Sequence, residues 1–513
     1  MKLSFVDSKP IGPAPALEKA TLGRRCMLQL AAAGAALFYV PALEKEALAN
    51  LRAGAPAKRV LIVNFAGAMR SSAAFYASTE VRYNPWGLIN GSSIPFGAIL
   101  DDTSAPYVLG TDWQGATAPR FRDLFGTLSV VGSWDDKRGD HLRARYVETS
   151  GAEGGSEPGV LVRAYNGLDD ALGTGSVTVP PFQVDPISAL GTGPGEFSRY
   201  SAVGIAGPSG LPSQNAISPG VLSAAGNDWA ASDTARGELD TAVSATRSGF
   251  ARDLADAFAA HRRASRQVGA TLAQPWVNVG NTAANFRSAT YGKVTLGGSS
   301  VDLSNQMLFD LFTAALGIGT DVAANQLTQH PAYDAAINAA LSIRLLQMGS
   351  PALGLEFGSF DLHSGEKEMG PVLYRFAGRL LSTLAWLLQR MPDPSTPGKS
   401  MFDTTMILTI TDFGRDPANP QTGFNGGDGS DHGNDPSCYY VAHTVMGAGT
   451  IGGRVLAKVD NAGANAFRAD IAPERYTIRD VLATTLWAIG LDQANPQWGF
   501  PDIGSPIQRL WSA

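Results

Sequence analysis

The sequence predicts an α/β protein whose central sheet is mostly parallel and flanked by helices. Short apolar runs rich in β-branched residues recur along the chain, as expected of buried strands. Longer segments with an apolar stripe at helical spacing lie between them. Strands that alternate with helices are typical of parallel sheets, because a parallel connection needs a crossover segment. The 513 residues include 58 Gly and 31 Pro, which indicates many long, ordered loops.

The individual elements follow from the same patterns. Six apolar runs are predicted strands, at residues 60–65, 128–132, 353–357, 405–410, 438–446 and 454–459. Four segments are predicted to be helical, at residues 233–270, 303–348, 372–391 and 477–491. Residues 150 to about 230 are rich in Gly, Ser and Pro and show little periodicity, so an irregular insertion is expected there.

The first 49 residues have the features of a twin-arginine export signal. The pair Arg24-Arg25 precedes an apolar, Ala-rich run at 27–40, and the Ala-Leu-Ala segment at 47–49 provides a cleavage site. The run is shorter than the roughly 20 residues that a spanning helix needs. We therefore expect the twin-arginine translocase as a partner during export, and a periplasmic or extracellular location. Because charged residues at 44–46 separate the run from the cleavage site, a retained N-terminal anchor is the alternative.

Composition excludes several classes of function. Acidic residues outnumber basic ones by 46 to 40, and the formal net charge is −6, so nucleic acid is not expected as a partner. Beyond the signal no apolar run reaches 18 residues, and we expect no transmembrane helix in the mature chain. Cys438 is the only cysteine after residue 49, so stability must come from the core rather than from an internal disulfide.

Side chains that can bind metals or anions follow four of the predicted strands, and a Gly-rich loop adds more. They are Ser71 and Ser72, then Asp140, His141 and Arg143, then Asp361 and His363, then Asp412 and Arg415, and in the loop Asp428, Asp431 and His432. Because the carboxyl ends of parallel strands meet at one edge of a sheet, we expect these side chains to gather there. Imidazole and carboxylate groups together suit zinc, manganese or iron.

Each of these groups also has a purely structural interpretation. Asp361 could cap a helix, Asp140 and His141 could begin one, and the Asp-Phe-Gly-Arg segment at 412–415 could form a turn. Residues 426–431 match a single calcium-binding nonapeptide repeat, although such repeats work as stacks. The remaining histidines are interpreted as solvated or as part of the core: His261, His330 and His443.

The order of the motifs resembles the exported bacterial family called domain of unknown function 1501, a distant relative of the alkaline phosphatase and sulfatase superfamily. The segments that carry the resemblance are 139–141, 358–363, 412–415, 429–433, 477–484 and 506–508. The resemblance covers most of the mature chain. It implies an alkaline-phosphatase-like domain over residues 50–513, with an insertion or cap region at 150–350, after a signal at 1–49.

The resemblance also implies a metal site that hydrolyses phosphate or sulfate esters. In the superfamily two metals clamp the attacking and leaving oxygens of the ester. Carried over to this chain, Asp361 and His363 supply an Asp/His loop, Asp412 the carboxylate after a later strand, and His432 the final histidine. This set is expected to hold one divalent metal (Zn, Mn or Ca), or none. Asp412 would assist catalysis, and Arg143 or Arg415 would neutralise the anionic ester.

The chain also departs from the superfamily pattern. Ala66 stands where the first metal-binding Asp is expected, and Phe413 stands where a histidine is expected. The nucleophile has only positional candidates: Ser71, Ser72, Thr103 and Ser104. Two functions therefore stay open, a metal-dependent ester hydrolase and a non-catalytic binding or structural protein of the cell envelope with a degenerate site.

Overall fold

The computed structural model describes residues 51–511 with interruptions, of which the longest are 192–201, 206–289, 317–332, 418–430, 457–475 and 492–503. The predicted export signal and the predicted helix at 233–270 lie outside the described residues, as do several residues singled out above: Thr103, Ser104, His261, His330 and Asp428. The domain boundaries expected from the sequence stay predictions.

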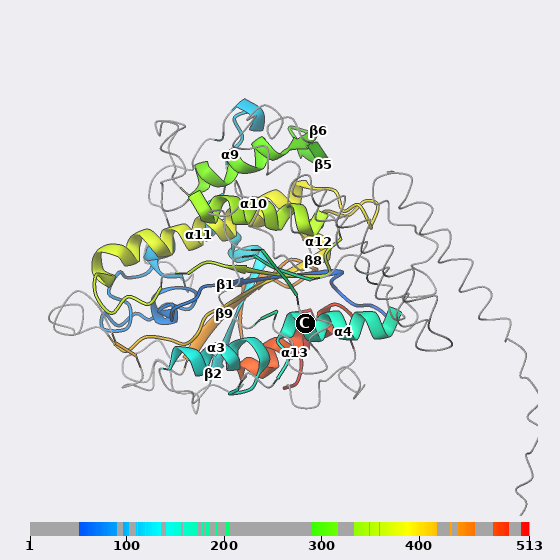
Figure 1. Ribbon diagram of the computed structural model, residues 1–513. Helices are drawn as coiled ribbons and strands as arrows, with labels where there is room; N and C mark the ends of the chain where they lie inside the picture. The colour runs from blue at the N-terminus through cyan, green and yellow to red at the C-terminus, as the bar shows by residue number, and fades with distance from the viewer. Residues whose placement is uncertain are drawn as a thin grey trace, which may run out of the picture. The chain divides into compact units, whose positions relative to one another are not determined.

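An eight-stranded sheet forms the centre of the described structure (Figure 1). In spatial order its strands are β10 (Arg454–Leu456), β2 (Leu128–Trp134), β9 (Tyr440–Met446), β8 (Thr405–Ile410), β1 (Arg59–Asn64), β7 (Ala352–Glu356), β3 (Phe182–Val184) and β4 (Val203–Ile205). Strand β9 runs antiparallel to β2 and β8, whereas every other described pair in this sheet is parallel. The expected α/β class with a mostly parallel sheet is confirmed.

Strand β1 shows why a run of apolar residues becomes a central strand. It pairs in parallel with β7 on one side and β8 on the other, and all six of its residues are buried. Successive side chains point to opposite faces of the sheet, so Leu61 and Val63 join one apolar cluster while Val60 and Ile62 join another. Both faces therefore have to be covered by helices.

The helices form two layers (Figure 1). The layer on the Leu61 face contains α9 (Asn305–Ala315), α10 (Tyr333–Gln347) and α11 (Glu366–Arg390), and the layer on the Val60 face contains α3 (His141–Ser150), α4 (Val160–Leu172) and α13 (Ile478–Ala488). The short helix α12 (Met401–Thr404) leads into β8, and a separate hairpin consists of β5 (Thr290–Leu296) and β6 (Ser299–Ser304). The described 3₁₀ helices are η2 (Ser71–Ala73), η4 (Ala98–Leu100), η5 (Thr111–Trp113), η6 (Phe121–Thr127) and η13 (Gln508–Leu510).

Three expectations about the elements need correction. The stretch from 150 to about 230 contains helix α4, strand β3 and the edge strand β4, so it is not irregular throughout. The segment 303–348 is not one helical block, because β6 ends at Ser304 and two helices follow. Helix α11 begins at Glu366, before Pro371, rather than at residue 372. No described helix is both long enough and apolar enough to cross a membrane.

Candidate metal centre

The ends of three strands bring histidines and a carboxylate to one edge of the sheet. Asp361 and His363 follow the carboxyl end of β7, and His141 follows that of β2. His432 lies before β9, and because β9 runs opposite to its neighbours its amino end lies at the same edge. The reversed direction of β9 thus allows a segment that precedes a strand to supply a side chain at this edge.

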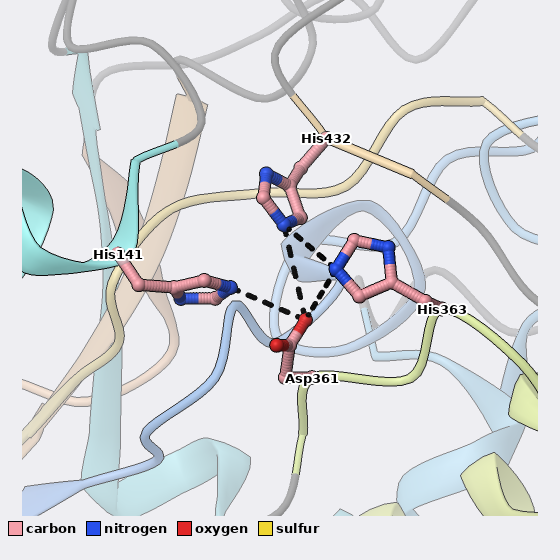
Figure 2. Close-up of side chains that lie close together, drawn as sticks. All are labelled: His141, Asp361, His363 and His432. Carbon is pink, nitrogen blue, oxygen red and sulfur yellow. Dashed lines mark hydrogen bonds and ion pairs between the residues drawn. The ribbon is translucent and has the colours of Figure 1, made fainter.

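Four side chains converge there: His141, Asp361, His363 and His432 (Figure 2). Their facing ligand atoms all lie within 4.8 Å of one another. The distance from Asp361 Oδ1 to Nε2 is 3.2 Å for His141, 3.1 Å for His363 and 3.8 Å for His432. Tetrahedral zinc ligands at 2.0–2.1 Å from the metal are separated by about 3.3 Å. The spacing therefore fits one metal ion.

His141 is held by a cap on one side and a carboxylate on the other. Asp140 is the N-cap of α3, and its side chain accepts the backbone N–H groups of Leu142 and Arg143. The Nδ1 atom of His141 lies 2.8 Å from Asp412 Oδ2, so the imidazole donates there and its Nε2 lone pair faces Asp361. That Nε2 atom is buried and has no hydrogen-bond partner among the described residues. A metal ion would satisfy it.

Two carboxylates near His141, those of Asp412 and Asp361, favour the protonated form of its imidazole. Burial lowers the pKa of His141, but the hydrogen bond and charge of Asp412, together with Asp361, outweigh burial and raise it. Such carboxylate–histidine pairs fix the ring of a metal ligand and increase its basicity. The raised pKa in the metal-free protein is therefore the effect of the same contact that would make His141 a strong ligand.

His363 and His432 face each other through their Nε2 atoms, which are 3.1 Å apart. Two neutral nitrogens with lone pairs toward each other repel unless a proton or a cation lies between them. Burial lowers the pKa of His432, and the positive charge of Arg415 and the neighbouring histidines lower it further. This favours the neutral form of His432, which is the form that binds metals.

Phe413 occupies the position where the superfamily pattern expects a histidine, and it packs on two of the ligands. Its ring centroid lies 4.7 Å from that of His141 and 4.6 Å from that of His432. Phe413 is buried. The aromatic side chain therefore fixes the orientation of two imidazoles instead of supplying a ligand of its own.

Asp361 is also held by Arg415, whose side chain is 1% exposed and which binds Oδ1, the same oxygen that the histidines face. The guanidinium donates to Asp361 Oδ1 at 2.8 Å and to the carbonyls of Gly67, Ala68 and Phe360. Burial raises the pKa of Asp361, but the charges of His141 and Arg415 outweigh it and hold this pKa below its usual range. Gly67 has a φ of +103°, and a Cβ there would lie 2.5 Å from the Asp361 backbone nitrogen, so glycine permits this close approach.

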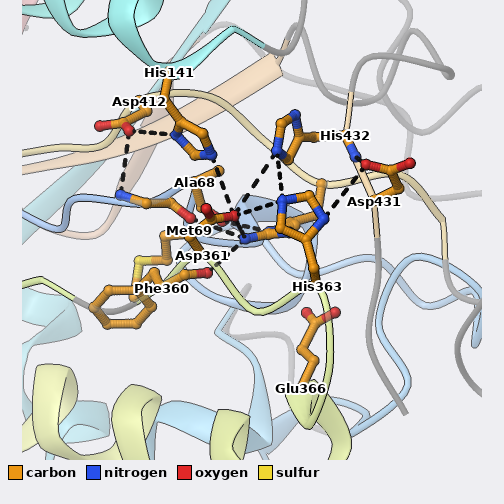
Figure 3. A network of polar contacts seen from close by, with 12 residues as sticks. Ala68, Met69, His141, Phe360, Asp361, His363, Glu366, Asp412, Asp431 and His432 are labelled. Atoms are coloured by element: carbon orange, nitrogen blue, oxygen red, sulfur yellow. Dashed lines mark hydrogen bonds and ion pairs between the residues drawn. The ribbon is translucent and has the colours of Figure 1, made fainter. Parts of the chain in front are cut away.

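The structure places Asp412 behind His141 rather than among the four facing ligand atoms (Figure 3). Its carboxylate is buried, accepts from His141 Nδ1 at 2.8 Å and from the Gly67 N–H at 3.3 Å, and lies 3.6 Å from Arg145 Nε. With donors on these sides, Asp412 orients the imidazole of His141. His141, rather than Asp412, completes the group of four side chains that could hold a metal ion.

The other residues expected at the site lie in different surroundings. Arg143 is exposed and forms an ion pair with Glu153. Ser71 and Ser72 are both buried, and Ser72 Oγ donates to the carbonyl of Tyr83. Arg415 could meet a substrate anion only by leaving the partners that it braces.

His141 was among the polar side chains expected at this edge, but the ligand set implied by the family resemblance did not include it. The motif at 139–141 was recognised after a predicted strand, but its local pattern was that of a helix start. The segment does begin a helix, because Asp140 caps α3, and at the same time the side chain of His141 points toward Asp361. The available signal was the position of this histidine after a central strand.

Comparisons with known proteins add a family likeness. No match was found among curated protein sequences. Among solved structures, the crystal structure of Ps i-CgsB in complex with k-i-k-neocarrahexaose matches with 8% identity and a TM-score of 0.34, covering 88% of this chain and 75% of that chain. A TM-score at this level does not establish a shared fold, so the fold assignment depends on the sheet topology above. Residues 304–499, which include Asp361, His363 and His432, match the model of the family described as Protein of unknown function (DUF1501), and this confirms the family resemblance seen in the motifs.

Proposed function

We propose that this protein binds one divalent transition metal through His141, Asp361, His363 and His432, and that the centre hydrolyses phosphate or sulfate esters. The observation that carries the proposal is the convergence of three Nε2 atoms on one carboxylate oxygen at the ligand-binding edge of the sheet. Asp412 and Arg415 support the set by orienting a histidine and the carboxylate.

The donor set selects among the three metals expected from the sequence. Calcium takes six to eight oxygen ligands, whereas this cluster offers three nitrogens and one carboxylate. Zinc accepts such a set in tetrahedral geometry, and manganese is the second choice. We therefore propose zinc as the resident ion and exclude calcium.

Hydrolysis needs access, a positive centre and a nucleophile. The side chains of Asp361 and His363 are 42% and 51% exposed, so a substrate can reach the cluster. A bound divalent ion supplies Lewis acidity toward the ester oxygen. Ser71 and Ser72 are buried, and Thr103 and Ser104 lie outside the described residues, so we propose a water molecule as the nucleophile.

The second candidate is a non-catalytic metal protein of the cell envelope. Four protein ligands complete a tetrahedral shell, as in structural zinc sites, whereas catalytic sites keep one position open. Ala66 and Phe413 point the same way, because neither supplies a second metal site. In this case the bound metal would stabilise the loops at the sheet edge.

Metal analysis of the purified mature protein, with aryl phosphate and aryl sulfate assays, separates these functions. About one equivalent of zinc with turnover that is lost in His363→Ala supports the hydrolase. The same metal content with no turnover above buffer leaves the non-catalytic protein. Less than about a tenth of an equivalent of metal after growth in zinc rejects both proposals.

We also propose export by the twin-arginine translocase to the periplasm or beyond. The support is the order of paired arginines, apolar run and cleavage site within residues 1–49. Replacing Arg24 and Arg25 by lysine is expected to leave the full-length chain in the cytoplasm, as cell fractionation would show. Unchanged export of this variant would contradict the proposed route.

A further inference from the structure

Arg70 is a fully buried arginine that binds two segments next to the candidate metal centre, one at Glu366 and one at Asp416. It follows β1, and its relative exposure is 0%. Its Nε and Nη2 atoms donate to the two carboxylate oxygens of Glu366 at 2.9 and 3.0 Å. Its Nη1 atom donates to the backbone carbonyl of Asp416 at 2.6 Å. The backbone N–H of Arg70 donates to the hydroxyl of Tyr374 on α11.

The first of these partners leads to His363. Glu366 is the first residue of α11 and follows His363 by one short turn of chain. Figure 3 shows the Glu366 and His363 side chains on the same stretch of backbone. Fixing the carboxylate of Glu366 therefore fixes the beginning of the helix that follows the ligand.

The second partner leads to His432 through one hydrogen bond between backbone groups and one from a backbone N–H to a side chain. The N–H of Asp416 donates to the carbonyl of Asp431 at 3.1 Å. The side chain of Asp431 accepts the N–H of His432 at 2.9 Å, and the same oxygen lies 3.5 Å from His363 Nδ1. A continuous set of contacts thus runs from Arg70 to both histidines.

We propose that Arg70 is a positioning residue that fixes the distance between the His363 loop and the His432 segment, and thereby sets the affinity of the centre for metal. The inference rests on the proposed function of this site. A planar guanidinium can hold a carboxylate with one edge and a carbonyl with another, whereas a lysine ammonium cannot reproduce that fork. Arg70→Lys should therefore keep the buried positive charge but lose the ability to hydrogen-bond Glu366 and the Asp416 carbonyl at the same time.

The other end of β1 offers a matched control. Arg59 is 4% exposed, and its guanidinium donates to both carboxylate oxygens of Asp393 at 3.1 and 2.9 Å. Arg59 begins β1, so it lies at the sheet edge opposite the metal ligands. Arg59→Lys disturbs a second buried arginine–carboxylate pair without touching either ligand segment.

The test compares Arg70→Lys and Arg59→Lys in the full chain by urea unfolding, hydrogen exchange and zinc affinity from chelator competition. We expect Arg70→Lys to increase exchange in both 360–369 and 411–417 and to weaken zinc binding by about 10- to 100-fold, as for other groups that orient metal ligands. Arg59→Lys should lower stability while leaving these segments and the zinc affinity unchanged. Glu366→Gln, which keeps the shape of the partner, should give a weaker form of the Arg70→Lys result.

Hydrogen exchange decides the inference independently of the metal. If the two segments loosen no more in Arg70→Lys than in Arg59→Lys at equal loss of stability, the positioning role is overturned, whether or not zinc binds. If both segments loosen but the wild-type protein binds no zinc, the positioning role stands and the proposed function fails.

Discussion

Histidines occur both in the core of the sheet and at the edge where the four side chains converge. The two surroundings differ in the partners that they offer to the ring nitrogens. In the core, His443 on β9 is fully buried, its Nδ1 donates to the Thr409 carbonyl at 2.9 Å, and its Nε2 accepts from Ser133 Oγ at 2.7 Å. At the edge, His141 is satisfied at Nδ1 by Asp412 but has no hydrogen-bond partner at Nε2 among the described residues.

The difference shows how a structural histidine is distinguished from a candidate ligand. Both nitrogens of His443 have protein partners, and burial lowers its pKa to about 4, so it stays neutral and structural. The edge histidines instead direct Nε2 toward a shared carboxylate. Burial alone therefore does not mark a candidate ligand, whereas a ring nitrogen that faces a shared carboxylate does.

The largest effect is expected from removing an edge histidine. His363→Ala should reduce bound zinc from about one equivalent to below about a tenth, measured by elemental analysis after gel filtration, because the remaining set lacks a ligand. His443→Gln is the matched control and should retain the metal. Full zinc content in His363→Ala would show that the cluster is not the metal site.

The second largest effect is a pH dependence of stability that is caused by the core histidine His443. The unfolded chain protonates His443 below its ordinary pKa of 6.5, whereas the folded protein does so only below about 4. Stability should therefore fall as the pH decreases from 6.5 to 4, by about 3 kcal/mol at most for this group, and no further below that window. Urea unfolding of wild type and His443→Gln across this range measures the difference, and parallel curves for the two proteins would contradict it.

A smaller effect is expected from loosening an edge histidine without removing it. Asp412→Asn keeps the shape of the partner of His141 Nδ1 but removes its charge, and should weaken zinc binding by about 10- to 100-fold. Asp431→Asn is the comparison, because its oxygen lies 3.5 Å from His363 Nδ1 and holds that ring more loosely. Equal losses for both variants would mean that the shorter contact has no special role.

The smallest effect is expected from Arg143, which the sequence placed in the active site. Its ion pair with Glu153 is exposed on both sides, so Arg143→Gln should change the free energy of unfolding by less than about 1 kcal/mol and leave zinc binding intact. Calorimetry and chelator competition check this. A loss of ester turnover in this variant at unchanged stability would restore the catalytic role expected from the sequence.

The fold was largely predictable because central strands carry their own signal. The strand predicted at 405–410 has both of its bounds correct, since every residue of β8 is buried and the pattern is unbroken. Strands β3 and β4 were missed because each has three residues, which is too short for a periodic pattern. The edge of the sheet at which the candidate ligands gather was also predictable, because the carboxyl ends of parallel strands lie at the same edge.

The membership of the site was harder to predict because it depends on side-chain direction. Of the predicted ligand set, Asp361, His363 and His432 lie in the cluster together with His141, whereas Asp412 contacts His141 from outside it. His141 and Asp412 are 271 positions apart in the sequence. No local sequence pattern indicates which of the two side chains faces Asp361 and which lies behind it. Phe413 was interpreted as a lost ligand, whereas its packing against two imidazoles became visible only in three dimensions.

The reversed direction of β9 has a consequence for the order in which the protein is made. His432 enters the cluster from the segment before β9, so the ligands extend from residue 141 to residue 432 of the 513. During synthesis, the complete group of four side chains cannot form until residue 432 has left the ribosome, because the group joins residues from distant parts of the sequence. A pulse of zinc given to stalled nascent chains should therefore be retained only by chains released beyond the end of β9.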